Sequence, residues 1–184
     1  MIPPASRIPV PIEVRTARLL MRPWRADDAA ELLPVLEANQ EHLGPWIPKR
    51  VSEPAPVSVL EQRLAAFGAD FAACKEWRFG LFTLDDGQTL GELGLFPRSA
   101  SARMPFPGAD RVEIGYWLRA DFTGRGLVDE AARAALAIVA AIPQFSEVEI
   151  RCDPRNAPSV AVAKRLGFAV ETETPDLTIL TRRP

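Results

Sequence analysis

Hydrophobic and polar residues alternate over residues 111–118, which read RVEIGYWL, and Glu113 is one of the polar positions. A period of two is typical of a strand with one buried face. The next residues contain two glycines, Gly124 and Gly126, after which apolar side chains recur at helical spacing. This change of period predicts a helix from about residue 125 to residue 141. The pattern therefore predicts a strand, a glycine turn and a helix in immediate succession.

Similar patterns predict elements along the rest of the chain. Apolar runs and alternations predict strands at residues 13–24, 77–84, 89–96, 146–153, 169–174 and 177–183. Helical spacing predicts helices at residues 25–40, 56–77 and 156–168. Segment 41–50 is broken by glycine and prolines, and segment 97–110 has no period, so we expect a flexible loop at the latter. This order predicts an α/β fold in which helices flank a mixed sheet.

Composition limits the class of protein. The 184 residues are 47% hydrophobic and 25% charged, which is typical of a soluble globular protein with a full core. We expect a proline-rich arm at residues 1–12 and a single domain at residues 13–184. A net charge of −2 argues against general nucleic-acid binding. We recognise no apolar run of membrane-spanning length and no secretory leader, and two cysteines suit a reducing cytoplasm, where we expect the protein to act.

The glycine turn is a candidate anion-binding site. A helix N-terminus presents unpaired N–H groups and a partial positive charge, and glycines let the backbone approach an anion closely. Residues 123–128 would supply those amides. The alternative interpretation is a tight turn that binds nothing. No Gly-Lys-Ser/Thr follows, which excludes a nucleotide P-loop, and the third glycine of a dinucleotide fingerprint is missing.

Two segments together resemble a known family. YWLRADFTGRGLVDEA at residues 116–131 and NAPSVAVAKRLGF at residues 156–168 are similar to the Gcn5-related N-acetyltransferase (GNAT) family. GYWL, HLGPWIP and NAPS narrow the resemblance to the RimJ/RimL branch, whose enzymes acetylate N-termini of ribosomal proteins. The resemblance implies the GNAT fold: a mixed, mostly antiparallel sheet of about six to seven strands, flanked by helices, with a splayed strand pair that holds the cofactor.

The resemblance also implies which residues bind acetyl-coenzyme A (acetyl-CoA). In the family, a Gln/Arg-x-x-Gly-x-Gly/Ala motif binds its pyrophosphate. Thr123, Gly126 and Val128 occupy the three defined positions here, and only the glycine matches. Because the contacts come mostly from backbone amides, these departures weaken the motif more than they weaken the expected binding. The expected cofactor-binding residues are Trp117, Leu118, Thr123, Gly124, Arg125, Gly126, Leu127, Val128 and Asn156.

Acetyl transfer to an amine needs a neutral amine and a proton for the departing thiolate. Glu113 is the candidate base, acting directly or through a water; the alternative is a solvated or salt-bridged strand glutamate. Many members of the family carry a tyrosine as the acid, and that position is Ala163 here. Ser159, three residues after the expected N-cap Asn156, is the candidate acid instead, or a residue that only hydrogen-bonds the sulfur. Its alternative role is to serve the helix terminus.

Further side chains are assigned to the acceptor site or to the structure. Trp46, which lies in the proline-rich break, and Tyr116 are expected to bind the acceptor, and the loop 97–110 is a candidate cover for it. His42 is expected to be a loop residue. Cys152 is expected to be a buried structural thiol, although the resemblance places its strand beside the pantetheine channel. No ligand-type residues have zinc spacing, so no metal is predicted.

The sequence therefore predicts an acetyl-CoA-dependent N-acetyltransferase that moves an acetyl group directly to a primary amine. A protein or peptide N-terminal amine is one acceptor class, and an amino acid, polyamine or antibiotic is the alternative. A noncatalytic acyl-CoA binding module is a further alternative of another class. The partner expected is the amine acceptor, with a homodimer considered and with neither nucleic acid nor membrane expected.

Overall fold

The structure is a computed structural model that describes residues 9–184. Residues 1–8 of the predicted arm lie outside the described residues. Of the arm residues that the structure describes, Val10 belongs to the core, because it is only 4% exposed and packs among buried residues, whereas Ile12 is exposed.

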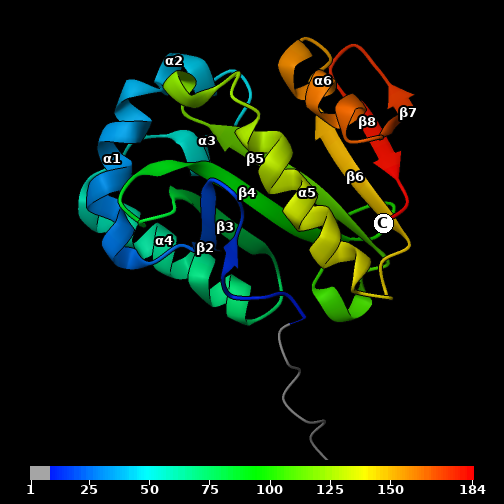
Figure 1. Ribbon diagram of the computed structural model, residues 1–184, viewed down its shortest axis with the longest axis horizontal. Coiled ribbons are helices and arrows are strands. Elements are labelled where there is room, and N and C mark those ends of the chain that lie inside the picture. Colours follow the sequence, from blue (N-terminus) through cyan, green and yellow to red (C-terminus); the bar gives the residue numbers. More distant parts are fainter. Residues whose placement is uncertain (1–8) are drawn as a thin grey trace, which may run out of the picture.

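One eight-stranded sheet runs through the described residues in the order β1-β2-β3-β4-β5-β6-β8-β7 (Figure 1). Every neighbouring pair is antiparallel except β5 and β6, which are parallel. The mixed, mostly antiparallel sheet is therefore confirmed. Its strands are β1 Val14–Arg15, β2 Leu19–Pro23, β3 Trp77–Thr83, β4 Thr89–Arg98, β5 Arg111–Leu118, β6 Glu147–Cys152, β7 Ala169–Glu173 and β8 Thr178–Arg182.

The sheet has one strand more than the patterns predict, because segment 13–24 forms two strands. Thr16 donates its backbone N–H to the carbonyl of Leu19 at 2.9 Å, and its Oγ1 accepts the Leu19 N–H at 3.0 Å. These bonds close a tight turn between β1 and β2. The turn contains neither glycine nor proline, so the usual sequence signals of a turn are missing.

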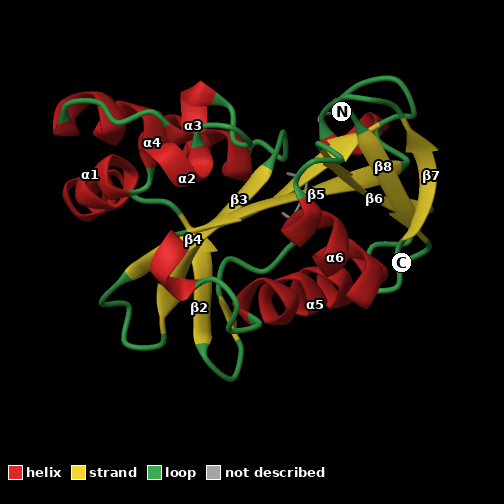
Figure 2. Cartoon of the chain, turned by 90° about the horizontal axis from the view of Figure 1, so that it is seen from above, coloured by secondary structure: helices red, strands yellow, loops and turns green. Residues whose placement is uncertain are grey.

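Helices cover both faces of the sheet. Figure 2 shows α1–α4 on one face and α5 and α6 on the other. The predicted break at residues 41–50 contains parts of two helices of four residues each, so that His42 is helical rather than a loop residue. The helices are α1 Ala29–Ala38, α2 Gln40–Leu43, α3 Lys49–Ser52, α4 Val57–Ala72, α5 Leu127–Ala140 and α6 Ala157–Arg165, with short 3₁₀ helices at Ala26–Asp28, Phe106–Gly108 and Ala120–Phe122.

The loop 97–110 packs on the core at its C-terminal end, although its sequence has no period. The ring of Phe106 lies 5.5 Å from that of Trp77 and 5.6 Å from that of Phe145, measured between centroids. Its backbone N–H donates to the carbonyl of Cys74 at 3.0 Å. Aromatic packing therefore anchors this half of the segment, for which the sequence predicts only a flexible loop.

The period of two in β5 corresponds to two different cores. Val112, Ile114 and Leu118 belong to the core that includes α5 and α6. Trp117 belongs to the core that includes α1 and α4. Glu113 lies on the Trp117 side, because side chains alternate between the faces of a strand. Side chains of different chemistry on β5 therefore lie on opposite faces of the sheet.

β5 and β6 pair only at their beginnings. The parallel register joins residues 111–113 to residues 147–149, and the last pair is Glu113 with Glu149. β5 continues to Leu118 and β6 to Cys152 without further pairing between them. The predicted splayed strand pair is therefore present, and its vertex lies at two carboxylates.

Two glycines should respond to alanine substitution in opposite directions. A Cβ at Gly94 in β4 would lie inside contact distance of the Phe96 ring, so Gly94→Ala should lower the free energy of unfolding by about 1–3 kcal/mol through overpacking. At Gly68 in α4 the nearest atom to such a Cβ is the Trp24 carbonyl oxygen at 3.5 Å, an ordinary contact. Gly68→Ala should raise the free energy of unfolding by about 0.5–1 kcal/mol. Urea denaturation of both variants measures these changes. Equal changes in the free energy of unfolding would contradict the packing described for the two glycines.

Candidate functional site

Three neighbouring cavities form one channel along the gap between β5 and β6. The turn cavity, of about 500 Å³, lies between the glycine turn and α6. The middle cavity, of about 290 Å³, shares Leu118, Thr123 and Val128 with it. The inner cavity, of about 230 Å³, shares Tyr116 and Ser159 with the middle one. A long ligand could therefore extend from the glycine turn to the vertex of the splayed strands.

The glycine turn exposes a row of backbone donors. Gly124 and Gly126 have φ of +71° and +72°, a left-handed conformation that glycine adopts without steric cost. Gly126 is the N-cap of α5 and offers no side chain to the helix end. Within residues 9–184, the N–H groups of residues 124–128 donate to no protein acceptor. Together with the helix dipole, these amides suit an anion such as a phosphate.

Two acidic residues in the first turn of α5 are held by arginines. Hydrogen bonds from Arg165 lower the pKa of Asp129, and Arg165 lies 2.8 Å from its carboxylate. Burial alone would raise the pKa of Glu130, but hydrogen bonds from Thr16 and Arg18 hold it below its usual value. Both carboxylates therefore stay ionised and paired beside the turn.

Helix α6 brings Ser159 into the channel. Asn156 is the N-cap of α6, and its Oδ1 accepts the Ser159 N–H at 3.3 Å, which confirms the expected cap. The Ser159 Oγ lies 3.1 Å from the hydroxyl of Tyr116, while the Ser159 backbone N–H takes part in the cap. Ala163, the position of the family's tyrosine, is fully buried, so a side chain there would lie in the core.

Tyr116 and Cys152 complete a group of protic side chains around Ser159. Burial raises the pKa of Tyr116 to about 12, although its hydrogen bond with Ser159 acts in the opposite direction. The phenol therefore keeps its proton at neutral pH. Burial likewise raises the pKa of the Cys152 thiol, which also contacts Ser159 and lines the inner cavity. Cys152 is half-buried rather than enclosed in the core as expected.

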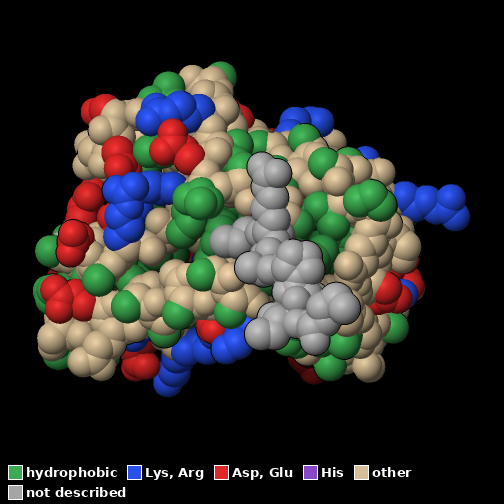
Figure 3. Space-filling model, turned by 90° about the horizontal axis from the view of Figure 1, so that it is seen from below, with side chains coloured by type: hydrophobic (Ala, Val, Ile, Leu, Met, Phe, Trp, Pro, Cys, Tyr) green, Lys and Arg blue, Asp and Glu red, His purple; other side chains and the backbone are tan. Residues whose placement is uncertain are grey.

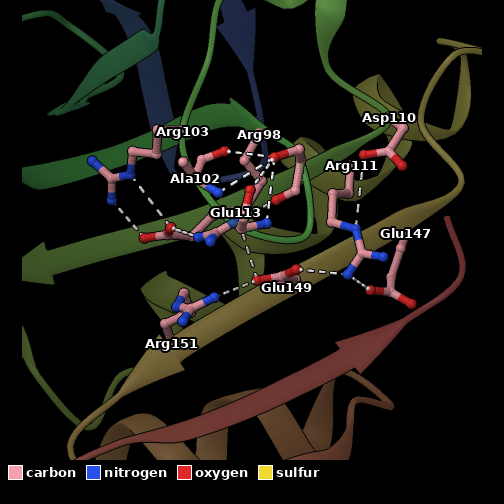
Figure 4. Close-up of polar contacts among 11 residues, drawn as sticks. Arg98, Ala102, Arg103, Asp110, Arg111, Glu113, Glu147, Glu149 and Arg151 are labelled. Atoms are coloured by element: carbon pink, nitrogen blue, oxygen red, sulfur yellow. Dashed lines mark hydrogen bonds and ion pairs between the residues drawn. The ribbon is translucent and has the colours of Figure 1, made fainter.

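Glu113 lies at the vertex of the splayed strands in a cluster of arginines (Figure 4). Its Oε2 accepts from Arg98 Nη1 at 2.6 Å and its Oε1 from Arg103 Nη2 at 2.5 Å. Arg98 also lies 3.5 Å from Glu149, the partner of Glu113 in β6. Glu113 is 8% exposed and lines the inner cavity, so it is a salt-bridged residue that still faces the channel.

A second buried ion pair also lines the inner cavity. Arg78 Nη1 donates to Glu92 Oε1 at 2.6 Å, and Trp24 Nε1 donates to Glu92 Oε2 at 2.7 Å. The Arg78 guanidinium also pairs with Glu76 and lies 4.8 Å from the centroid of the Phe96 ring. Each oxygen of the Glu92 carboxylate therefore accepts a hydrogen bond from a protein donor.

The structure brings most of the expected residues to the channel. Trp117, Leu118, Thr123, Gly124, Gly126, Leu127, Val128 and Asn156 line one or more of its cavities, and so do Trp46, Tyr116, Glu113 and Ser159. The side chain of Arg125 is not among the lining groups, because it donates to the Asp121 carbonyl at 2.7 Å and lies over Phe122. Its contribution to the turn is therefore its backbone N–H. His42 lines the middle cavity and its Nε2 lies 3.1 Å from the Leu118 carbonyl oxygen.

Several lining residues were not found from the sequence. On α6, Pro158, Ala161, Val162 and Arg165 line the turn cavity at the spacing of one helix face, and that spacing was the available signal. In the inner cavity Arg78 and Glu92 stand as charges inside apolar strand segments, which is a signal of a buried pair. Arg50 and Arg103 lie in segments without a period and gave no signal.

The surface and the remaining chemistry add few constraints. On the face seen in Figure 3, basic and acidic side chains are interspersed. Among the helices of residues 9–184, none is long and apolar enough to cross a membrane. The same residues contain no group of three His, Cys, Asp or Glu side chains placed to hold a metal ion.

Comparisons with known proteins agree on one family. The "Probable N-acetyltransferase YjcK" of Bacillus subtilis (strain 168) is 25% identical over 153 residues, which cover 83% of this chain and 81% of the relative. The [ribosomal protein uS5]-alanine N-acetyltransferase of Escherichia coli (strain K12) is 26% identical over 169 residues, covering 92% and 84%. The solved structure of RimL, a ribosomal L7/L12 alpha-N-protein acetyltransferase in complex with coenzyme A, shares the fold with a TM-score of 0.76 at 18% identity, covering 95% and 97%.

A family model for the acetyltransferase (GNAT) domain matches residues 18–169, which include the glycine turn, Glu113 and Ser159. The eight-stranded sheet with its splayed strand pair and the channel that follows it agree with this match. The chain belongs to the acetyltransferase (GNAT) family.

Proposed function

We propose that the chain transfers an acetyl group directly from acetyl-CoA to the N-terminal amine of a protein or peptide. As a member of its family it is an N-acetyltransferase with acetyl-CoA as donor. The observation that carries the proposal is the channel from the unpaired amides of the glycine turn, past Ser159, to Glu113. Relatives named as ribosomal-protein acetyltransferases favour a protein acceptor.

The residues of the turn cavity fit the pyrophosphate of acetyl-CoA. The N–H groups of residues 124–128 have no protein acceptor, and a Cβ placed on Gly124 would meet no atom within 4 Å, so an anion can approach the backbone there. The thioester end would then lie toward Ser159 and Tyr116, where the middle and inner cavities meet. Acetyl-CoA supplies the activated acetyl group, and the chain supplies position and protons.

Ser159 and Tyr116 are placed to supply a proton to the departing sulfur. The single proton of the phenol has two acceptors at 3.1 Å, the backbone carbonyl oxygen and the Oγ of Ser159. When the phenol donates to Oγ, the serine proton is free to point into the cavity. Because Tyr116 keeps its proton at neutral pH, it can hold the serine hydroxyl in this orientation. Ser159 is therefore the proposed donor and Tyr116 the residue that orients it.

Glu113 is the proposed acceptor of the amine proton. Arg98 and Arg103 occupy three hydrogen-bonding directions of its two oxygens, whereas a carboxylate offers about four. The remaining direction suits a water that relays the proton from the amine. The arginines therefore leave Glu113 one free hydrogen-bonding direction and fix the orientation of its carboxylate.

An acceptor screen tests the proposed function. Peptides with different first residues and free amines of the alternative class are incubated with acetyl-CoA, and acetylated products are measured by mass spectrometry. We expect peptides to be acetylated with higher kcat/KM than amino acids or polyamines. Turnover of free amines alone would contradict the proposal, and binding without turnover of any amine would favour a noncatalytic module.

Because ribosomal proteins are made in the cytoplasm, we propose that the protein acts there. The homodimer stays a prediction that a measurement of the molecular mass in solution tests.

Gly126→Val should weaken coenzyme A binding by about 10-fold or more, which corresponds to about 1.4 kcal/mol per decade. The φ of +72° disfavours any L side chain, and a shift of the turn would misalign its amides. Gly167→Val is the matched control, because Gly167 has a φ of +82° at the end of α6 and does not line the channel. Calorimetric titration should show normal affinity for the control, even where its stability falls. Equal affinities of both variants would place the pyrophosphate elsewhere.

Glu113→Gln should lower kcat by about 10²-fold, the usual scale for a positioned base, and alter the acidic limb of the pH–rate profile. Glu149→Gln is the matched control because Glu149 contacts the same Arg98 but does not line the inner cavity. Both variants should unfold at lower temperature, since each leaves a buried arginine with one partner fewer. A loss of turnover that is equal in the two variants would assign Glu113 a structural role only.

Ser159→Ala should lower kcat by about 10-fold or more while coenzyme A affinity stays close to normal. The Asn156 cap remains, because it uses the backbone of residue 159, so stability should fall by only about 1 kcal/mol for one lost hydrogen bond. Tyr116→Phe removes the orienting hydroxyl, and the double variant should be no slower than Ser159→Ala. Turnover and melting temperature are measured on all three proteins. Additive losses in kcat would show that the two hydroxyls act independently.

A further inference from the structure

Basic side chains outnumber acidic ones on the wall of the inner cavity. The charged residues that line it are Glu92 and Glu113, together with Arg50, Arg78, Arg103 and Arg151. Both carboxylates are already occupied, Glu92 by Arg78 and Trp24 and Glu113 by Arg98 and Arg103. The wall is therefore cationic, with no carboxylate left unpaired to attract a positively charged acceptor.

Three of the four arginines are paired with carboxylates of the protein. Arg78 pairs with Glu76 and Glu92, and Arg151 lies 3.0 Å from Glu149. Arg103 pairs with Glu113, and its side chain remains 42% exposed. In the part of the chain that the structure describes, Arg50 has no ion-pair partner. Among the arginines of this wall, the Arg50 guanidinium is therefore the one left to pair with a carboxylate of a ligand.

Arg50 is presented from a fixed position. It belongs to α3, and the neighbouring residues Trp46 and Ile47 also line the inner cavity. The helix is tied down because Ser52 Oγ donates to the Ile47 carbonyl at 3.1 Å and Arg63 donates to the Glu53 carbonyl at 3.0 Å. A guanidinium on a fixed backbone loses less entropy when it binds a carboxylate, and its fork of donors matches that group.

We propose that the acceptor is an acidic N-terminal peptide, with an Asp or Glu side chain within its first residues, and that Arg50 binds this carboxylate. The proposal rests on the proposed function, because it names the class of peptide that the same site takes. Arg103, which is half-exposed beside Glu113, adds to the positive potential. Cations close to the incoming amine also favour its neutral form, which is the form that attacks the thioester.

Peptides that differ at one residue test this preference. Two otherwise identical peptides carry Ala-Glu or Ala-Gln at their N-termini, and kcat/KM for acetylation is measured for each. The Glu peptide should be preferred by about 10-fold, because a hydrogen-bonded charge pair contributes about 1.5 kcal/mol. An Ala-Lys peptide should be the poorest acceptor of the three. Equal values for the Glu and Gln peptides would overturn the proposal.

Variants at neighbouring positions assign the preference to Arg50. Arg50→Gln should bring the ratio of Glu to Gln peptide close to one, and Arg50→Glu should favour the Lys peptide. Lys49→Gln is the matched control: it removes the same charge from an exposed residue of the same helix that does not line the cavity, and its ratio should stay near that of the unchanged protein. A ratio that falls equally in Arg50→Gln and Lys49→Gln would overturn the assignment to Arg50.

A binding measurement separates this proposal from the proposed function. The N-acetylated forms of the Glu and Gln peptides are titrated into the protein saturated with coenzyme A, and no turnover is required. Tighter binding of the Glu form supports the acidic acceptor even if peptide acetylation fails, in which case only the proposed function is contradicted. Equal or absent binding of both forms overturns the acidic acceptor, whatever the acetylation assay gives.

Discussion

Hydrogen bonding between the parallel strands β5 and β6 ends after Glu113 and Glu149, and the site depends on this ending. The gap beyond the vertex is where the inner and middle cavities lie, and it lets residues from opposite faces of the sheet meet. Tyr116 reaches Ser159 from the α5 and α6 side, while Glu113 lies on the side of α1 and α4. A fully paired sheet would keep these groups apart.

Charge pairing holds the vertex in place. Arg98, buried at the end of β4, joins Glu113 of β5 to Glu149 of β6, so it links three adjacent strands where the last two separate. Arg111 and Arg151 complete the pairing of Glu149. Burying these charges is costly, and only a complete set of partners offsets that cost. The arrangement therefore favours one geometry of the vertex over others, which a catalytic site requires.

Local features of the site were predictable from the sequence, and contacts between distant segments were not. The glycine turn and the Asn156 cap follow from short patterns, because period, glycine and N-cap signals each act within a few residues. The bond between Tyr116 and Ser159 joins residues 43 positions apart and depends on how α6 packs against β5. Arg103 reaches Glu113 from a segment with no period, and the pairing of Arg78 with Glu92 depends on the register of β3 and β4. The pattern of hydrophobic and polar residues alone does not predict these contacts between distant segments.

The first turn of α5 combines a helix end that should bind an anion with two carboxylates, and two arginines from other segments make this combination possible. Asp129 and Glu130 lie at the end of the helix that should attract a phosphate, and two free carboxylates there would repel it. Arg165 of α6 and Arg18, which precedes β2, neutralise them, so the positive end of the helix dipole is left to act on the ligand. Affinity for an anion at this turn is therefore shared by segments more than 100 residues apart, since Arg18 reaches Glu130 across 112 positions. The N-terminal hairpin, which does not line the channel, helps in this way to set the electrostatic potential inside it.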